Sequence, residues 1–124
     1  MIDNFEDYTA ILTDYERDEI VPALSEFLRT RVGSKNAIRN KELCRIFTAK
    51  GLQGLNEARV RKCINYIRRK GLVKHLIANS KGYFVATSIE QAERYIHSLH
   101  QREYAIKAVA DVLSDDLSGL LFIA

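Results

Sequence analysis

A chain of 124 residues, 47% of them hydrophobic and 28% charged, is long enough for one globular domain with an appended helix. Its two cysteines stand far apart without a CxxC pair, which argues against a zinc finger and a disulfide scaffold. The sequence has no apolar run of the roughly 18 residues that a membrane span requires, and its first residues are acidic. We therefore expect a cytoplasmic protein that has no membrane partner.

Charge is distributed unevenly along the chain, although the formal net charge is only +3. Residues 1–28 hold eight acids and one arginine, whereas residues 29–81 hold fifteen lysines and arginines and two acids. Such a segregated basic block is typical of a surface that binds nucleic acid. The alternative interpretation is a set of solvated helix faces.

The first predicted helix begins at the capping box of Thr13 and Glu16 and runs to about residue 31. Pro22 lies inside it and is expected either to kink it or to divide it into two shorter helices. Gly33 is placed to end it. Its apolar residues recur at helical spacing: Ile20, Leu24, Phe27 and Leu28.

Two further helices are predicted in the basic block. Residues 36–39 are too short to assign and could form a single short strand. Asn40 is expected to cap a helix that ends at Gly51, and Asn56 is expected to cap the next, which ends at Gly71. Their inward stripes are Leu43, Cys44, Ile46 and Phe47, and then Val60, Cys63, Ile64 and Ile67.

A change of periodicity after Gly71 predicts a β-hairpin. Residues 72–78 and 83–87 are rich in strand-forming residues and are separated by a turn that contains Gly82. Ser88 and Gln91 then form a second capping box, which opens a long helix to about residue 113.

The predicted fold is mainly α with a small β-hairpin, an α+β arrangement. Two helices joined by a short glycine-containing turn and followed by a hairpin indicate a winged helix-turn-helix with a long C-terminal helix. We expect a winged-helix domain over residues 1–87, which includes an acidic segment at 1–12. Residues 88–124 form the C-terminal helix and an apolar tail.

The third predicted helix supplies the main candidate for contact with nucleic acid. With its apolar stripe turned inward, the opposite face carries a small residue, an amide and several cations. These types suit a major groove, because an alanine permits close approach, Asn pairs with adenine, and Arg or Lys reaches guanine or phosphate. The residues are Ala58, Arg61, Lys62, Asn65 and Arg69. A merely solvated face is the alternative.

Two neighbouring segments could add backbone contacts. Lys74 and Lys81 belong to the predicted hairpin, and Lys81 is equally explained as a solubilising turn residue. Arg39 and Lys41 lie near the start of the second helix, where free backbone donors favour a phosphate.

Other chemistry receives less support from the sequence. Cys44 and Cys63 fall on inward stripes and are expected to be packed as small apolar residues. Glu93, His97 and His100 share a helix face but lack a fourth metal ligand. The N-terminal acids show no catalytic spacing with a lysine or histidine, which leaves a nuclease as a remote alternative. We expect no enzyme activity, no cofactor, no metal and no small-molecule ligand.

The last helix carries a heptad pattern with one charge, at Glu103. Part of this stripe is expected to cover the domain core, but the helix is too long for that alone, so we predict a homodimer formed through its second half. The stripe is Ile89, Ala92, Ile96, Leu99, Glu103, Ile106, Ala110 and Leu113. The apolar tail at 117–124 is expected to dock on its own domain or on a partner.

Residues 56–68, followed by 80–84, resemble small winged-helix proteins of bacteriophages and integrated elements, and so do residues 12–38. The resemblance extends to about Val109 and implies DNA binding in replication or gene control. It brings no catalytic residues, and the apolar tail does not match it.

The leading hypothesis is therefore sequence-specific binding of double-stranded DNA, as a transcriptional regulator or replication accessory of a phage-like element. The alternative is a protein-protein interaction module that uses the same basic surface, with the acidic first 28 residues able to mask that surface in the free protein.

Overall fold

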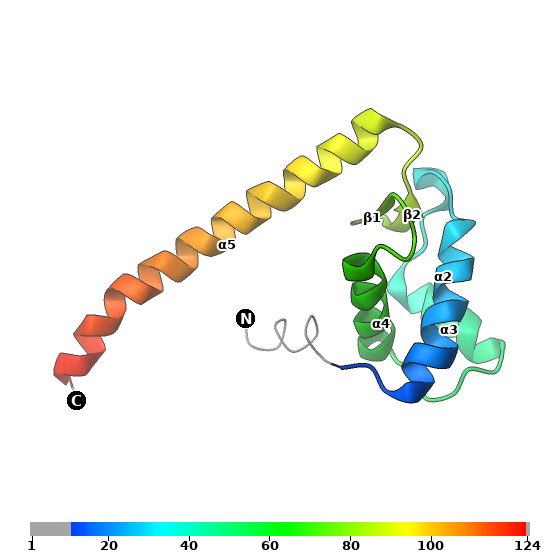
Figure 1. Cartoon of the computed structure of the whole chain (residues 1–124), viewed down its shortest axis with the longest axis horizontal. Coiled ribbons are helices and arrows are strands. Elements are labelled where there is room, and N and C mark those ends of the chain that lie inside the picture. Colours follow the sequence, from blue (N-terminus) through cyan, green and yellow to red (C-terminus); the bar gives the residue numbers. More distant parts are fainter. Residues whose placement is uncertain (1–10, 124) are drawn as a thin grey trace. The chain divides into compact units, whose positions relative to one another are not determined.

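The computed structural model describes residues 11–123, and of residues 118 and 121–123 it describes the backbone alone. The chain divides into two compact units, Met1–Thr87 and Ser88–Ala124, at the boundary expected from the sequence. The architecture is mainly helical, with a two-stranded antiparallel hairpin and a long C-terminal helix, so the α+β class is confirmed (Figure 1). Most of the predicted acidic segment lies outside the described residues. Within residues 11–123, no helix is long and apolar enough to cross a membrane.

The first helix begins with the predicted capping box. The backbone N–H of Thr13 donates to Glu16 Oε1 at 2.8 Å, and the backbone N–H of Glu16 donates to Thr13 Oγ1 at 3.2 Å. A π-helical segment, η1 (Glu16–Ile20), then leads directly into α2 (Val21–Arg29). Pro22 therefore does not divide the helix, because it lies in the first turn of α2, where its missing N–H is best tolerated.

Helix α4 (Glu57–Lys70) begins and ends where the sequence predicts. Asn56 caps it, since its side-chain oxygen accepts a hydrogen bond from the backbone N–H of Arg59 at 2.8 Å. Gly71 adopts the left-handed conformation, with φ of 64°, and ends the helix.

Helix α3 (Asn40–Ala49) begins one residue earlier than expected. Asn40 is the first residue of the helix and not its cap; the cap position belongs to Arg39, whose side chain makes no capping hydrogen bond. The Asn40 amide is used elsewhere, because its Nδ2 donates to the backbone carbonyl of Glu57 at 2.7 Å. This hydrogen bond ties the start of α3 to the start of α4.

The hairpin is shorter than predicted and consists of β1 (Leu76–Asn79) and β2 (Gly82–Val85). The tentative strand at residues 36–39 is reduced to Ile38, which forms an isolated antiparallel bridge with Tyr83. The residues just before it form a 3₁₀ turn, η2 (Ser34–Asn36).

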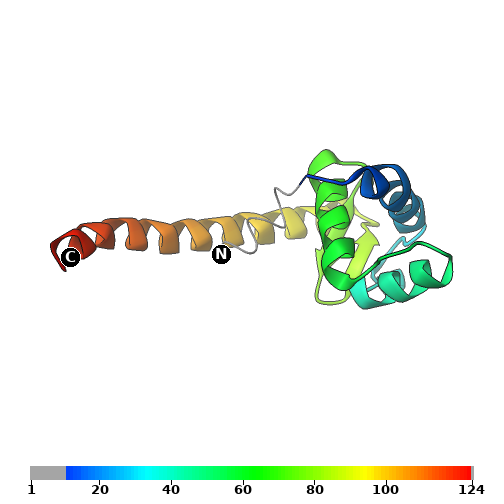
Figure 2. The same cartoon turned by 90° about the horizontal axis from the view of Figure 1, so that it is seen from below.

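The core of the first unit lies between α2, α3, α4 and the hairpin (Figures 1 and 2). The predicted inward stripe of α4 is confirmed, because all four of its residues are buried. On α3, Leu43 and Phe47 are buried, whereas Cys44 and Ile46 are half-buried at the core's edge. The principal buried side chains are Ile20, Leu24, Leu28, Leu43, Phe47, Val60, Cys63, Ile64, Ile67 and Phe84.

The second unit is a single helix, α5 (Ile89–Ile123). It begins as predicted, with the Ser88 Oγ accepting a hydrogen bond from the backbone N–H of Gln91 at 3.2 Å. It continues well beyond the predicted end near residue 113, so that most of the apolar tail is helical.

We expect Gly82→Ala to destabilise the first unit much more than Gly51→Ala. Both glycines have positive φ, which costs another residue about 1–3 kcal/mol. A Cβ at Gly82 would also overlap the carbonyl oxygen of Ile38, whereas a Cβ at Gly51 meets no atom within 4 Å. Urea unfolding of the two variants measures the difference, and equal losses would contradict the close approach of the hairpin to Ile38.

Candidate nucleic-acid interface

Hydrogen bonds bring together three ends of secondary structure: the hairpin turn, the start of α3 and the start of α4 (Figure 2). Tyr83 and Ile38 exchange two backbone hydrogen bonds, at 2.8 and 3.0 Å, beside the hairpin turn. Helix α3 starts two residues after Ile38, and Asn40 bonds to the first residue of α4. Side chains on these three ends therefore lie on one side of the domain.

Four cations project from this region, and we call them the cationic end: Arg39, Lys41, Arg61 and Lys81. All four side chains are exposed, and none forms an ion pair with another residue in the range 11–123. Ala58 is exposed in the first turn of α4, one turn before Arg61. The structure thus brings five of the nine predicted residues together.

The start of α3 adds backbone donors to the cationic end. Because the Arg39 side chain does not cap the helix, the first N–H groups of α3 have no side-chain acceptor from the cap residue. Free N–H groups at a helix start, next to Arg39 and Lys41, favour an anion such as a phosphate.

The expectation that Lys62 faces outward is wrong. Its Nζ lies 2.7 Å from Glu16 Oε1, and Arg59 Nε lies 2.8 Å from the other carboxylate oxygen of Glu16. The Glu16 side chain is 4% exposed and that of Lys62 is 20% exposed. A buried carboxylate from the acidic start of the chain therefore holds two of the cations of α4 against the domain.

Asn65 also fails to face outward, because it is only 5% exposed. Its amide is therefore not available to pair with a base. Helical spacing alone placed Lys62 and Asn65 on the solvent side, since it takes no account of what packs over that face.

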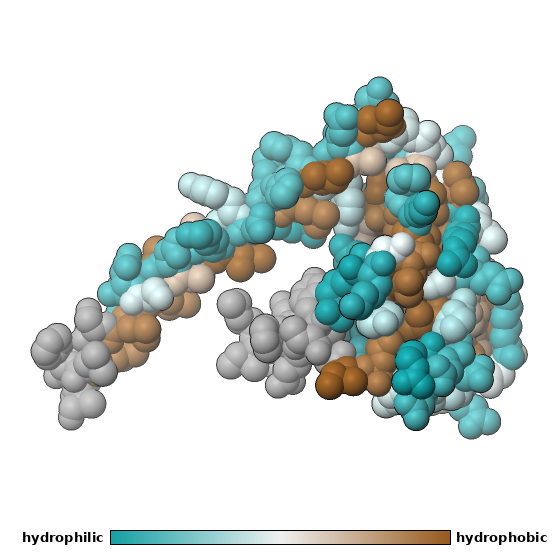
Figure 3. All heavy atoms as spheres, in the orientation of Figure 1, coloured by the Kyte–Doolittle hydropathy of each residue, from teal (hydrophilic) through white to brown (hydrophobic). Residues whose placement is uncertain are grey.

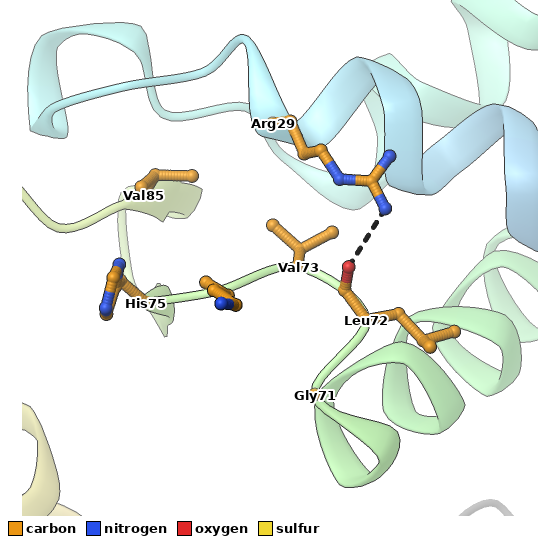
Figure 4. Close-up of a pocket in the computed structure, with 7 residues that line it drawn as sticks. Arg29, Gly71, Leu72, Val73, His75 and Val85 are labelled. Carbon is orange, nitrogen blue, oxygen red and sulfur yellow. Dashed lines mark hydrogen bonds between the residues drawn. The ribbon is translucent and has the colours of Figure 1, made fainter.

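Arg69 and Lys74 lie away from the cationic end. Arg69 is exposed in the last turn of α4, about 12 Å along the helix axis from Arg61. Lys74 follows the end of α4 and, with Arg29 and His75, borders a shallow pocket of about 510 Å³ (Figure 4). In this pocket Arg29 Nη2 donates to the backbone carbonyl of Leu72 at 3.0 Å. Arg69 and Lys74 therefore lie toward the opposite end of α4, where Arg29 supplies a further cation.

Sequence reasoning did not identify the pairing of Glu16 with Arg59 and Lys62. The sequence does contain a feature that could have indicated this pairing. Glu16 is the acid of the capping box, and Arg59 and Lys62 stand three residues apart, on one face of a helix. Nothing in the spacing showed that the two helices pack with these side chains facing each other.

The environment of Glu16 acts on its pKa in opposite directions. Burial raises the pKa, whereas hydrogen bonds from Lys62, from the Thr13 backbone and from Arg59 lower it, and the net pKa lies below the usual 4.5. The carboxylate is therefore charged at neutral pH, which is the form that holds both cations.

The remaining candidate groups are the two cysteines and the side chains that could ligate a metal. Burial and the nearby Glu16 carboxylate raise the pKa of Cys63 to about 12, so its thiol stays protonated at neutral pH. Cys44 is half-buried beside the core. Within residues 11–123, no three His, Cys, Asp or Glu side chains gather into a group that could hold a metal ion.

We expect Glu16→Gln to lower the free energy of unfolding by about 2–3 kcal/mol at neutral pH, because both cations lose their counter-charge but remain partly exposed to water. Since the pKa of Glu16 is lowered in the folded protein, its contribution is complete above pH 4.5 and is lost as the pH falls through the lower, folded value. Urea unfolding of the wild type and of Glu16→Gln, at neutral and at acid pH, measures this loss of free energy of unfolding.

The matched control is Glu19→Gln, which changes an exposed acid of the same helix. The difference between wild type and Glu16→Gln should shrink in acid, whereas the control should stay close to wild type throughout. A Glu16→Gln effect that persists unchanged in acid would show that the ion pairs are not its cause.

Comparisons with protein-family models, with curated proteins and with solved structures returned no match.

Proposed function

We propose that this chain binds double-stranded DNA as a winged helix-turn-helix protein, with α3 and α4 as the helix-turn-helix and the hairpin as the wing. The observation that carries the proposal is the cationic end: four exposed cations that form no ion pair among the described residues, on three element ends that hydrogen bonds hold together. In a winged helix these are the parts that approach the duplex.

Each part of the cationic end has a role in the proposal. Ala58 lets the first turn of α4 approach the floor of the major groove, and Arg61 reaches a guanine edge or a phosphate. Arg39 and Lys41, with the open start of α3, hold a phosphate, and Lys81 contacts the backbone from the hairpin turn.

Asn65 is buried and Lys62 is paired with Glu16, so neither is free to contact a base. In this proposal the contacts to bases therefore come from residues nearer the start of α4. Arg69 and Lys74, at the other end of α4, would contribute phosphate contacts only where the duplex follows the helix along its length. Arg61 therefore carries most of the sequence preference in this proposal.

The biological setting we propose is gene regulation or replication in a phage-like element. Its support is the sequence resemblance to small winged-helix proteins of bacteriophages and integrated elements. A regulator and a replication accessory require the same duplex-binding surface.

We expect Arg61→Ala to weaken binding to a selected duplex by about 1–3 kcal/mol and to relax the preference at one base pair. Lys81→Ala should weaken binding to all duplexes evenly and reduce the salt dependence by about one unit of slope, because it contacts phosphate. Fluorescence anisotropy at several salt concentrations measures both effects.

The control is Arg94→Ala, which removes an exposed cation from α5, outside the first unit. It should leave the duplex affinity close to wild type. If replacing Arg39, Arg61 and Lys81 together leaves binding unchanged, the cationic end is not the interface. If the wild-type chain fails to bind any duplex at low salt, the basic surface belongs instead to a protein-protein contact.

A further inference from the structure

Helix α5 presents a long apolar face that the described residues of its own unit leave uncovered. It runs for 35 residues, about 52 Å. Its large apolar side chains are strongly exposed; Ile106, Leu113 and Leu120, for example, are 58%, 62% and 63% exposed. Figure 3 shows apolar residues gathered along one side of the helix and polar residues along the other. An apolar face of this length in water marks an interaction surface.

The apolar residues of α5 follow a heptad repeat that continues through the tail. Because the helix extends to Ile123, Leu117 and Leu120 join the predicted stripe in the same spacing of three and four. A strict seven-residue repeat drifts by about 20° per heptad on a straight helix and so favours a left-handed supercoil with another helix. We call the ten residues the α5 seam: Ile89, Ala92, Ile96, Leu99, Glu103, Ile106, Ala110, Leu113, Leu117 and Leu120.

We propose that the α5 seam binds a second copy of this chain in a parallel two-stranded coiled coil. In heptad terms, two of the five a positions are β-branched, Ile89 and Ile96, and three of the five d positions are leucine. β-Branched residues at a positions with leucine at d positions favour a parallel coiled coil of two helices over larger helical bundles. The leucines at d are Leu99, Leu113 and Leu120.

The one charge in the seam, Glu103, is an argument for a second copy as the partner. Glu103 is at an a position, where a single polar residue fixes register at a cost in stability. In a parallel pair, an a side chain packs against the preceding g residue of the other helix, and that residue is Arg102. Two copies in register therefore place each Glu103 beside an arginine that the other copy provides.

Arg102 is available for this contact, since it is exposed and forms no ion pair within residues 11–123. By contrast, Lys107 is already paired with Asp111 on its own helix, at 2.8 Å. The seam thus contains the charge that must be neutralised, Glu103, which lies 3.2 Å from His100 Nδ1 on its own helix, and Arg102, directly beside the seam, supplies the cation from the other copy.

This inference goes beyond the proposed function and does not depend on it, because the seam belongs to the second unit and the cationic end to the first. If both hold, one dimer carries two cationic ends, and the two could bind two half-sites of one duplex.

Sedimentation equilibrium of the full chain tests the pairing. We expect twice the chain mass of 14.2 kDa at micromolar concentration. Leu99→Glu with Leu113→Glu should reduce the mass to that of one chain, because it places two acids in the seam. The matched control adds the same two acids on the polar side of α5, as Gln101→Glu with Ala108→Glu, and should remain dimeric.

Two further variants test register and orientation. Glu103→Leu should tighten the dimer at least about tenfold, because it removes the polar layer from the seam. Leu99→Cys should form a disulfide-linked dimer under mild oxidation, because equal d positions face each other only in a parallel pair; the parent chain is the control.

The proposal is overturned if the wild-type chain sediments as a monomer, or if the seam variant stays dimeric. A dimer that Leu99→Cys fails to link would overturn the parallel arrangement, and a Glu103→Leu dimer no tighter than wild type would overturn the placement of Glu103 in the seam.

Discussion

The carboxylate of Glu16 is the point on which the arrangement of the first unit depends. Its two oxygens bind Lys62 and Arg59 on α4, while one of them also accepts the backbone N–H of Thr13 at the start of the first helix. One buried charge therefore completes a helix cap and joins two helices. It also decides which cations of α4 remain on the surface, because those that bind Glu16 cannot reach a ligand.

The division of cations along α4 follows from this contact and from the path of the chain. Arg61 is left exposed one turn after the start of α4, which Asn40 joins to the start of α3. Arg69 and Lys74 are carried to the far end by the length of the helix. The strongly basic block of the sequence is thus not one surface: Arg59 and Lys62 are neutralised internally, and the candidate cations stand at two ends of α4.

Much of the fold could be predicted from the sequence because local chemistry specifies it. Capping residues Thr13 and Asn56, the glycine at 71 and the alternation within the hairpin each act on their near neighbours. The wrong expectations concern contacts between residues that are far apart in the sequence. Asn40 is expected to cap α3, but its side chain donates a hydrogen bond to the carbonyl of Glu57. Lys62 is expected to face solvent, but it pairs with Glu16, 46 residues earlier. Spacing on one helix cannot reveal which other element packs over it. The candidate residues that the structure brings onto one side of the domain are those near the element ends.

The π-helical segment before Pro22 has a consequence for the placement of Glu16. The Val21 N–H bonds to the Glu16 carbonyl, five residues back, and the ring nitrogen of Pro22 has no hydrogen with which to continue an α-helical ladder to Asp18. A widened turn advances each residue through a smaller rotation than an α-helical turn does. On a regular α-helix, residues spaced four apart drift by about 40° per step, so a continuous α-helix would carry Glu16 progressively out of line with the buried Leu24 and Leu28. The widened turn reduces this drift, and Glu16 stays on the buried side of the helix. An imino acid six positions downstream, which cannot donate a hydrogen bond to Asp18, thereby contributes to the rotational phase of the carboxylate.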